Sequence, residues 1–280
     1  MIVAFVSGSS QSGQTTMAVS LASILKDHFP VTILDCDIEQ INAAVFQPPK
    51  WDIEEEVKIS APMINRADCT YCLNCVNNCR FGVFLDFKKS IVILPERCAN
   101  CGTCFSFCTG HAISLTSYVL GTIRKGTLEK LTVVEARINE LAVKADLLLY
   151  KARSHVDPLG VNIVDCAPHF SDYAPCSTLT PNFFVIVTEE TSQSLKELVP
   201  MAEALNNIKK PFGVLINKSR SINSPVEQYC KKQGLLLLGV LPYEDAVNNG
   251  KLPSHQFVLH SPWKIFFEKL WDRILEELTQ

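Results

Sequence analysis

Eight of the twelve cysteines stand in two copies of one spacing, CxxCxxCxxxC. The first copy is Cys69, Cys72, Cys75 and Cys79, and the second is Cys98, Cys101, Cys104 and Cys108. Thiolates at this spacing bind two [4Fe–4S] clusters, and the fourth cysteine of each copy serves the other cluster. We therefore expect one cluster on Cys69, Cys72, Cys75 and Cys108, and a second on Cys79, Cys98, Cys101 and Cys104. A zinc or disulfide framework is the alternative, and two complete copies make it the weaker one.

The two cysteine runs belong to an internal repeat. Each run is followed by a short strand-like segment, at residues 83–85 and 112–115. The Pro that usually follows the fourth cysteine is replaced by Arg80 and Thr109, but this residue is not an iron ligand. The pattern predicts an inserted α+β domain of the bacterial ferredoxin type at residues 60–117.

A second group of residues has the frame of a phosphate-binding loop, GxxxxGxT. It comprises Gly8, Ser9, Ser10, Gln11, Ser12, Gly13, Gln14, Thr15 and Thr16. An apolar strand at 2–6 precedes it and a helix follows, so backbone N–H groups could cradle phosphate oxygens at the helix N-terminus. Thr15 stands where a hydroxyl would bind Mg²⁺, and Gln14 stands where the phosphate-contacting Lys would be.

The rest of the sequence predicts an α/β domain whose strands and helices would position these residues. Further strands are expected at 31–34, 131–134, 160–165, 183–187, 213–217 and 235–240, with helices at 192–205, near 226–229 and at 262–278. Alternating strands and helices are typical of a mainly parallel sheet flanked by helices. We therefore predict one discontinuous domain, residues 1–59 and 118–280, into which the ferredoxin-type domain is inserted.

The set and order of these motifs resemble the MinD/Mrp-type P-loop ATPases that carry an inserted two-cluster ferredoxin domain. Residues 35–42 are similar to the family's segment after its second strand, in which the second Asp, here Asp37, helps to position the attacking water. Asp165, at the end of a strand, fits the Walker B position. The resemblance implies a P-loop NTPase-like fold and ATP or ADP with Mg²⁺ as ligand.

Two shorter segments extend this resemblance along the chain. Asn217-Lys218 is similar to the family's adenine-side pair, and residues 241–244, which include Pro242, are similar to its late turn. The family works as a dimer, so the resemblance also implies a homodimer or a heterodimer with a MinD/Mrp-like paralogue. A redox or cluster-acceptor protein would be a further partner.

The chain departs from the family where charge is needed. The signature lysine is replaced by Ser9 or Ser10, the second lysine by Gln14, and the Pro-Pro-Gly switch by residues 166–169, Cys-Ala-Pro-His. Lysines neutralise charge in the phosphoryl-transfer transition state, and a neutral Gln supplies none. We expect nucleotide binding by backbone amides, with ATP hydrolysis slow or absent unless an intact partner contributes.

The cysteines outside the two runs have two interpretations. Cys166 and Cys176 could form an extra metal site completed by a dimer mate. Buried Cys also behaves as a small hydrophobic residue, and this is the expectation for Cys36 and Cys230.

Bulk properties exclude several classes. A net charge of −3 and a pI near 6.1 give no basic footprint for nucleic acid. No apolar run reaches the ~18 residues of a membrane span, and the terminal helix mixes acidic with basic residues, so membrane binding is not expected. No secretory leader is visible, and metal-binding cysteines suit a reducing cytoplasm.

The leading hypothesis is a protein that passes electrons through two [4Fe–4S] clusters while its nucleotide-binding domain sets conformation or partner contact. The alternative is a scaffold or carrier for the assembly of iron–sulfur or other metal clusters. A spatial regulator of the MinD kind is a third possibility, and the missing lysines disfavour it.

Overall fold

The computed structural model describes residues 1–37, 48–139, 145–167, 180–244, 258 and 263–279. Its main element is a nine-stranded sheet. The strands are β1 (Ile2–Ser7), β2 (Val31–Cys36), β3 (Lys50–Ile64), β6 (Ile113–Leu128), β7 (Leu131–Ile138), β8 (Val161–Cys166), β9 (Phe183–Glu189), β10 (Phe212–Ser219) and β11 (Leu237–Pro242). Their order across the sheet is β11-β10-β9-β1-β8-β2-β7-β6-β3.

The predicted mainly parallel sheet is confirmed. From β11 to β7 every neighbouring pair is parallel, whereas β6 pairs antiparallel with both β7 and β3. The described helices that cover it are α1 (Gln14–Leu25), α4 (Ala145–Ala152), α5 (Ser192–Asn207), α6 (Pro225–Gln233) and α9 (Trp263–Thr279). The central strands are buried on both faces, which explains why their sequences are continuous apolar runs.

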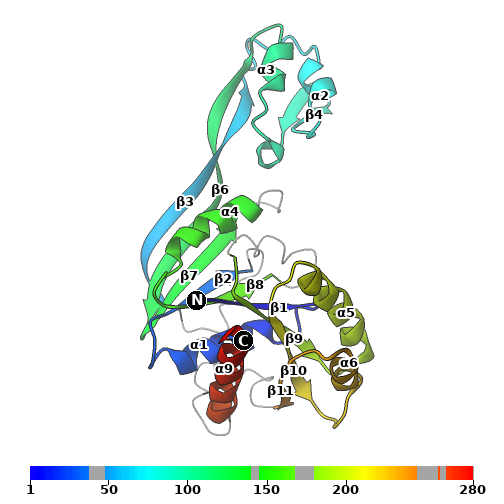
Figure 1. The fold of residues 1–280 in the computed structure, drawn as a ribbon. Helices are drawn as coiled ribbons and strands as arrows, with labels where there is room; N and C mark the ends of the chain where they lie inside the picture. Colours follow the sequence, from blue (N-terminus) through cyan, green and yellow to red (C-terminus); the bar gives the residue numbers. More distant parts are fainter. Residues whose placement is uncertain (38–47, 140–144, 168–179, 245–257, 259–262, 280) are drawn as a thin grey trace.

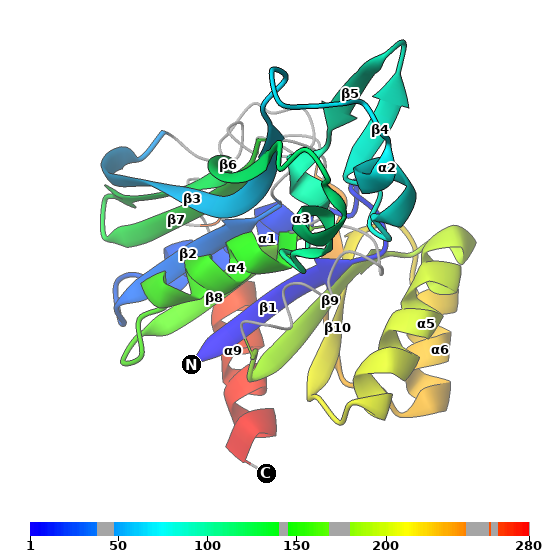
Figure 2. The same ribbon diagram turned by 90° about the horizontal axis from the view of Figure 1, so that it is seen from above.

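Two hydrophobic cores lie on the two faces of this sheet, and Figures 1 and 2 show the helices that flank it. Helices α1 and α9 cover one face, where Met17, Leu21, Phe267 and Trp271 contribute to the core. Helices α4, α5 and α6 cover the other. The apolar face of α9 therefore packs against the sheet. None of the described helices is long and apolar enough to cross a membrane.

Strands β3 and β6 form a long antiparallel ribbon that the sequence did not reveal. They pair from Lys50 with Thr127 to Ile64 with Ile113. The outer half of the ribbon extends away from the sheet and ends in a separate cysteine lobe, defined as residues 65–112 (Figure 1). Ser60 pairs with Ser117, so the predicted limits of the inserted domain lie opposite each other on the ribbon.

The cysteine lobe consists of short elements around a small core. They are α2 (Asn74–Asn78), β4 (Phe84–Phe87), β5 (Ser90–Ile93), the 3₁₀ turn η1 (Pro95–Arg97) and α3 (Thr103–Phe107). The buried residues of this core are Cys75, Val83 and Phe84, together with Ile113 at the start of β6. Such a core is small for a stable unit of this size.

The backbone of the lobe repeats as the cysteine spacing does. Positive φ angles occur at equivalent positions of the two runs, in the pairs Tyr71 and Asn100, Leu73 and Gly102, and Gly82 and His111. The amide N–H of Gly82 donates to Cys79 O at 3.1 Å, and that of His111 donates to Cys108 O at 3.1 Å. The internal repeat is therefore one of conformation as well as of sequence.

Candidate functional site

The predicted phosphate loop lies between β1 and α1, at the carboxyl ends of the parallel strands. Gly13 begins the helix with φ +83°, and a Cβ on it would lie 2.4 Å from Asn217 Nδ2. Only glycine fits both conditions. Asn217 Nδ2 donates to Ser12 O at 2.8 Å, so a side chain from β10 fixes the position of the loop.

Charged groups lie around the loop. Lys218 Nζ donates to Gln11 O and forms an ion pair with Glu189 at 3.0 Å. The side chain of Glu197, on α5, packs against Gly8. A carboxylate beside the loop and a lysine already paired with an acid make this a weaker anion site than a loop carrying its own lysines.

Gln14 does not extend into the loop. Its side chain is buried and its Nε2 donates to Asp165 Oδ1 at 2.7 Å and to Cys166 O. The residue that replaces the phosphate-contacting lysine thus ties α1 to the end of β8. The Thr15 side chain lies beside the Asp165 carboxyl group and lowers its pKa, which brings the predicted magnesium-side hydroxyl and the Walker B acid together.

Two acids meet at the ends of β2 and β8. Asp35 lies opposite Asp165 in the strand register, and both carboxyl groups are buried. Burial raises the pKa of Asp165 to about 8, with the charge of Asp35 adding to the effect. Burial also raises the pKa of Asp35 to about 6, against the opposing influence of Arg137, whose Nη2 donates to Asp35 Oδ2 at 2.8 Å.

Asp165 Oδ2 is buried and has no hydrogen-bond partner among the described residues. A carboxylate oxygen in this position, next to a threonine hydroxyl, suits an Mg²⁺ ion that brings its own water ligands. The residues present therefore fit the predicted Mg-nucleotide.

The raised pKa of Asp165 predicts a specific pH dependence. Between about pH 4 and pH 8 the folded chain binds more protons than the unfolded chain, so the free energy of unfolding falls as the pH rises. The variant Asp165→Asn should abolish the part of this slope between pH 6 and 8 and be more stable than the native chain at pH 8 by on the order of a few kcal/mol. Urea unfolding without nucleotide or Mg²⁺ measures this.

A surface acid provides the control for this experiment. Asp27 is exposed, and its hydrogen bond with Lys130 lowers its pKa, so Asp27→Asn should leave the slope between pH 6 and 8 unchanged. An unaltered slope in Asp165→Asn would contradict the assignment.

The remaining predicted nucleotide-site residues lie at the same edge of the sheet. Asp37 is buried, its N–H donates to Asp35 Oδ1 at 3.1 Å, and its carbonyl accepts from Arg137 Nη1 at 2.8 Å. Pro242 ends β11 in register with Ser219 of β10. Arg137 was not predicted from the sequence, because its partner Asp35 is 102 residues away.

Of the four cysteines outside the two runs, the structure describes Cys36, Cys166 and Cys230. Cys166 and Cys36 are register neighbours on β8 and β2, and both are buried in the same hydrophobic core. Cys230 is buried as well. Cys176 lies outside the described residues, so the extra metal site at Cys166 and Cys176 stays a prediction.

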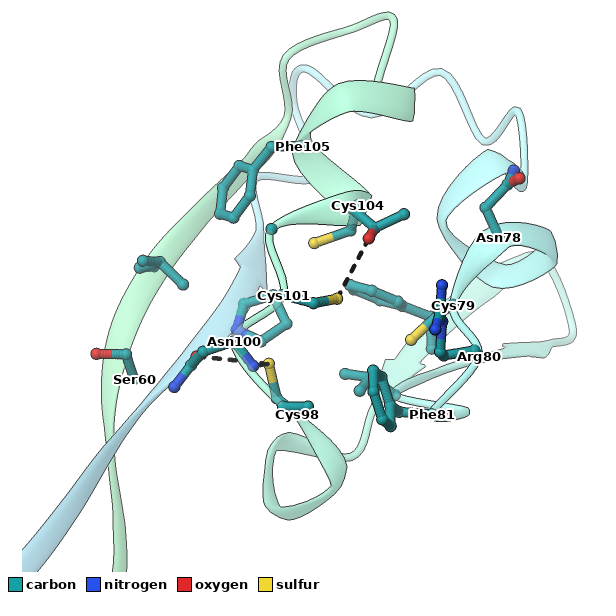
Figure 3. Close-up of a pocket in the computed structure, with 17 residues that line it drawn as sticks. Ser60, Asn78, Cys79, Arg80, Phe81, Cys98, Asn100, Cys101, Cys104 and Phe105 are labelled. Atoms are coloured by element: carbon teal, nitrogen blue, oxygen red, sulfur yellow. Dashed lines mark hydrogen bonds between the residues drawn. The ribbon is translucent and has the colours of Figure 1, made fainter.

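The eight cysteines of the lobe line two separate pockets. One has a volume of about 360 Å³, and its walls include Cys79, Cys98, Cys101 and Cys104. Figure 3 shows these four sulfur atoms facing a common space, with Phe81 and Phe105 at its sides. The other pocket, of about 20 Å³, is lined by the other four, Cys69, Cys72, Cys75 and Cys108.

Hydrogen bonds to sulfur recur in both pockets. Asn100 N–H donates to Cys98 Sγ at 3.4 Å, and Ala112 N–H donates to Cys108 Sγ at 3.2 Å. The Thr103 hydroxyl lies 3.3 Å from Cys101 Sγ and is the main cause that lowers the pKa of that thiol. Donors of this kind stabilise thiolates, whereas burial raises the pKa of the Cys75 and Cys104 thiols.

The described thiols do not form a site for a single metal ion. Within the described ranges, no group of three or more His, Cys, Asp or Glu side chains could hold one metal ion. A [4Fe–4S] cluster is ligated by four cysteine thiolates, one on each iron, so its ligands surround a wider space. The four thiols around the pocket of about 360 Å³ are compatible with that group, whereas the pocket of about 20 Å³ would have to widen to accept it.

Two curated proteins of one organism are similar to this chain. Uncharacterized protein MJ0579 of Methanocaldococcus jannaschii is 21% identical over 221 residues, which are 78% of this chain and 80% of that protein. Uncharacterized protein MJ0578 of the same organism is 29% identical over 94 residues, 33% of this chain and 34% of that protein.

Solved structures establish the fold. The septum site-determining protein MinD of Pyrococcus horikoshii, complexed with Mg-ADP, aligns with a TM-score of 0.57 at 14% identity and covers 98% of this chain and 95% of that one. A ParA family ATPase of Chlorobium tepidum aligns with a TM-score of 0.54 at 13% identity, over 98% and 97% of the two chains.

The family follows from a match along most of the sequence. The family model described as the CobQ/CobB/MinD/ParA nucleotide binding domain matches residues 3–253. This range contains the phosphate loop, the buried acids and the Asn217 contact described above. The chain therefore belongs to the CobQ/CobB/MinD/ParA nucleotide-binding domain family.

Proposed function

We propose that this chain is an iron–sulfur, nucleotide-binding protein that passes electrons through two [4Fe–4S] clusters in its cysteine lobe. Its MinD-like domain binds ATP or ADP with Mg²⁺ and hydrolyses ATP poorly on its own. The bound clusters would supply one-electron redox chemistry. The chain itself contributes the eight thiols, the donors to sulfur and the separation of the two sites.

One observation carries the iron–sulfur part of this proposal. Each pocket is lined by three cysteines of one run and the fourth cysteine of the other: Cys108 joins the first run's pocket, and Cys79 joins the second's. Crossed ligation is the arrangement of two-cluster ferredoxins. A zinc or disulfide framework gives no reason for this exchange.

The inserted unit would span residues 60–117. The β3–β6 ribbon separates the lobe from the nucleotide site, and one cysteine of each pocket, Cys72 or Cys101, is exposed. Exposure of this kind lets another redox protein approach each cluster. The nucleotide site would then act through conformation or partner contact rather than through direct contact with the clusters.

A dimer would explain a preserved loop that has lost its lysines. Residues 8–16 contain no lysine, and Gln14 is committed to Asp165 and Cys166. A related subunit with an intact signature lysine could supply the missing charge, and two proteins of one organism resemble this chain. A complex purified from its native source should then contain this chain and a MinD/Mrp-like paralogue. A pure homodimer would contradict that partner.

The nucleotide part is tested by binding and turnover in one sample. Mg-ATP should bind to the anaerobically purified, iron-loaded chain in equilibrium dialysis, without release of phosphate beyond the background rate. The reason is that the helix N-terminus of α1 remains to receive phosphate, whereas the lysine charge is missing.

The matched control for this measurement is Gly13→Ala. It forces a Cβ against Asn217 at φ +83°, so nucleotide binding should be lost while iron content is retained. ATP hydrolysis by the isolated native chain at an ordinary P-loop ATPase rate would contradict the proposal that it hydrolyses ATP poorly on its own. Absence of binding would leave the sheet domain, which is the nine-stranded sheet with the helices that cover it, as a support for the lobe.

A further inference from the structure

A third cavity of the cysteine lobe has no role in the function proposed above. It is an open groove of about 610 Å³ between the β4–β5 hairpin and the end of β3. Pockets for small ligands are typically ~300–1000 Å³. Its apolar walls are Met63, Ile64, Ile91, Val92 and Ile93. We call it the cationic groove, because two basic side chains, Arg66 and Lys89, also line it.

The two cations are available to a ligand. Arg66 and Lys89 are exposed and form no ion pair with any described residue. Asp68 and Asp86, which are close to these residues in sequence, hydrogen-bond to Asn65 and Tyr71 and do not line the groove. The lining of the groove therefore includes two cations and no carboxylate.

The turn that carries Lys89 is built against local preference. Phe87 pairs with Ser90, and the two residues between them, Lys88 and Lys89, have φ +47° and +66°. Hairpin turns with positive φ at both central positions favour Asn-Gly or Asp-Gly. Lysines there cost about 1 kcal/mol each, and strained positions of this kind cluster at ligand sites.

The groove is also held in shape. The Tyr71 hydroxyl donates a hydrogen bond to Asp86 Oδ1. This hydrogen bond fixes the Tyr71 ring, which also lines the groove, to the β4–β5 hairpin. A ligand would meet a formed surface and would not have to order it.

We propose that the cationic groove binds a small organic anion, an apolar planar body that carries a carboxylate. The carboxylate lies between Arg66 and Lys89, because a guanidinium matches a carboxylate with two parallel hydrogen bonds. The apolar body lies along Ile91 and Ile93 and against Met63.

The groove shares a wall with one of the cysteine pockets. Ile64, Cys69 and Ile91 line both cavities. If the clusters are as proposed, which this step assumes, an anion in the groove lies next to a cluster ligated by Cys69. The position suits a molecule that exchanges electrons with that cluster or adjusts its potential.

The test uses 2-naphthoate as the probe and the anaerobic, iron-loaded full chain. Isothermal titration calorimetry should show saturable binding, and the double variant Arg66→Gln, Lys89→Gln should bind about tenfold more weakly, since two charge-assisted contacts are lost. The uncharged analogue 2-naphthamide should show a similar loss with the native chain. Bound probe should also show ¹H line broadening that changes when the neighbouring cluster is reduced.

Lys88→Gln is the matched control. Lys88 occupies the same turn but lies over the Phe87 ring, 5.3 Å from its centroid, and does not line the groove. This variant should bind 2-naphthoate within about twofold of the native chain. Equal binding by the native chain and the double variant, or equal loss in Lys88→Gln, would overturn the proposal.

Iron analysis of the same sample separates this inference from the proposed function. If the chain binds 2-naphthoate in a charge-dependent way but contains no iron, the anion site is supported and the iron–sulfur proposal is contradicted. If the chain contains two clusters but shows no charge-dependent binding, the iron–sulfur proposal is supported and the anion site is contradicted. Binding that requires a whole acidic protein and never the naphthoate would also reject the small-anion site.

Discussion

Replacing Cys79 and Cys101 together by Ser should remove about half of the iron, whereas replacing Cys79 and Cys75 together should remove nearly all of it. The first pair lines a single pocket. The second pair belongs to one sequence run but lines two pockets. A cluster that loses a thiolate ligand is not retained. The amount of iron lost therefore depends on how many pockets lose a cysteine, and not on how many sequence runs do.

The measurement is iron per chain after anaerobic reconstitution, with EPR of the reduced protein to identify the surviving cluster. Native protein should contain about eight iron atoms, from two four-iron clusters. Cys230→Ser is the matched control. That thiol is buried in the sheet domain, and burial raises its pKa to about 11, so it stays protonated and its loss should cost no iron.

The opposite result would be equally informative. If each run served its own cluster, the Cys79 and Cys75 pair would spare half of the iron and the Cys79 and Cys101 pair would remove all of it. Zinc in place of iron in every variant would reject the iron–sulfur proposal altogether.

The sheet domain was predictable because its signals are local. Runs such as Val31–Leu34 and Phe183–Val187 are buried on both faces of a parallel sheet, and a buried strand is apolar along its whole length. The phosphate loop was equally visible, since glycine at Gly13 is required by the backbone conformation at that residue.

The ribbon was missed because most of β3 does not face a core. Glu54, Glu55 and Glu56 are exposed, and the alternation that marks a half-buried strand begins only at Val57. Residues on an edge strand are selected to remain in solvent. A composition of this kind resembles that of a loop, so the strand's length is set by its pairing with β6 and not by its own sequence.

The role of Gln14 could not be read from its position in the motif. The sequence shows only that a lysine is missing. Its partner Asp165 is 151 residues away, and the contact depends on the crossover that places β8 beside β1. The cationic groove is a similar case, since Arg66 and Lys89 line the same groove only after the hairpin has folded.

Removal of iron should unfold the cysteine lobe and leave the sheet domain folded. The two cores of the sheet domain contain dozens of buried side chains and no lobe residue. The lobe has Cys75, Val83 and Phe84 buried within it, and four further cysteines are among the partly buried residues packed on them. Small units without a sufficient core need a metal, and the binding energy of the metal is then folding energy.

Hydrogen exchange of the chain with and without an iron chelator measures this directly. Amides of α2, α3 and the β4–β5 hairpin should lose nearly all protection when iron is removed, while those of β1, β8 and β9 keep theirs. Protection in β3 should persist around Val57 and Ile59, which belong to a sheet-domain core, and fade toward Ile64.

The single-pocket variant supplies the internal control. With Cys79 and Cys101 replaced, one cluster remains on Cys69, Cys72, Cys75 and Cys108, and these residues come from both ends of the lobe. That cluster should keep the lobe closed as a loop, with exchange intermediate between the loaded and the iron-free chain. Full protection in the iron-free chain would mean that the lobe folds by itself, and iron binding by its thiols would then not be needed for folding.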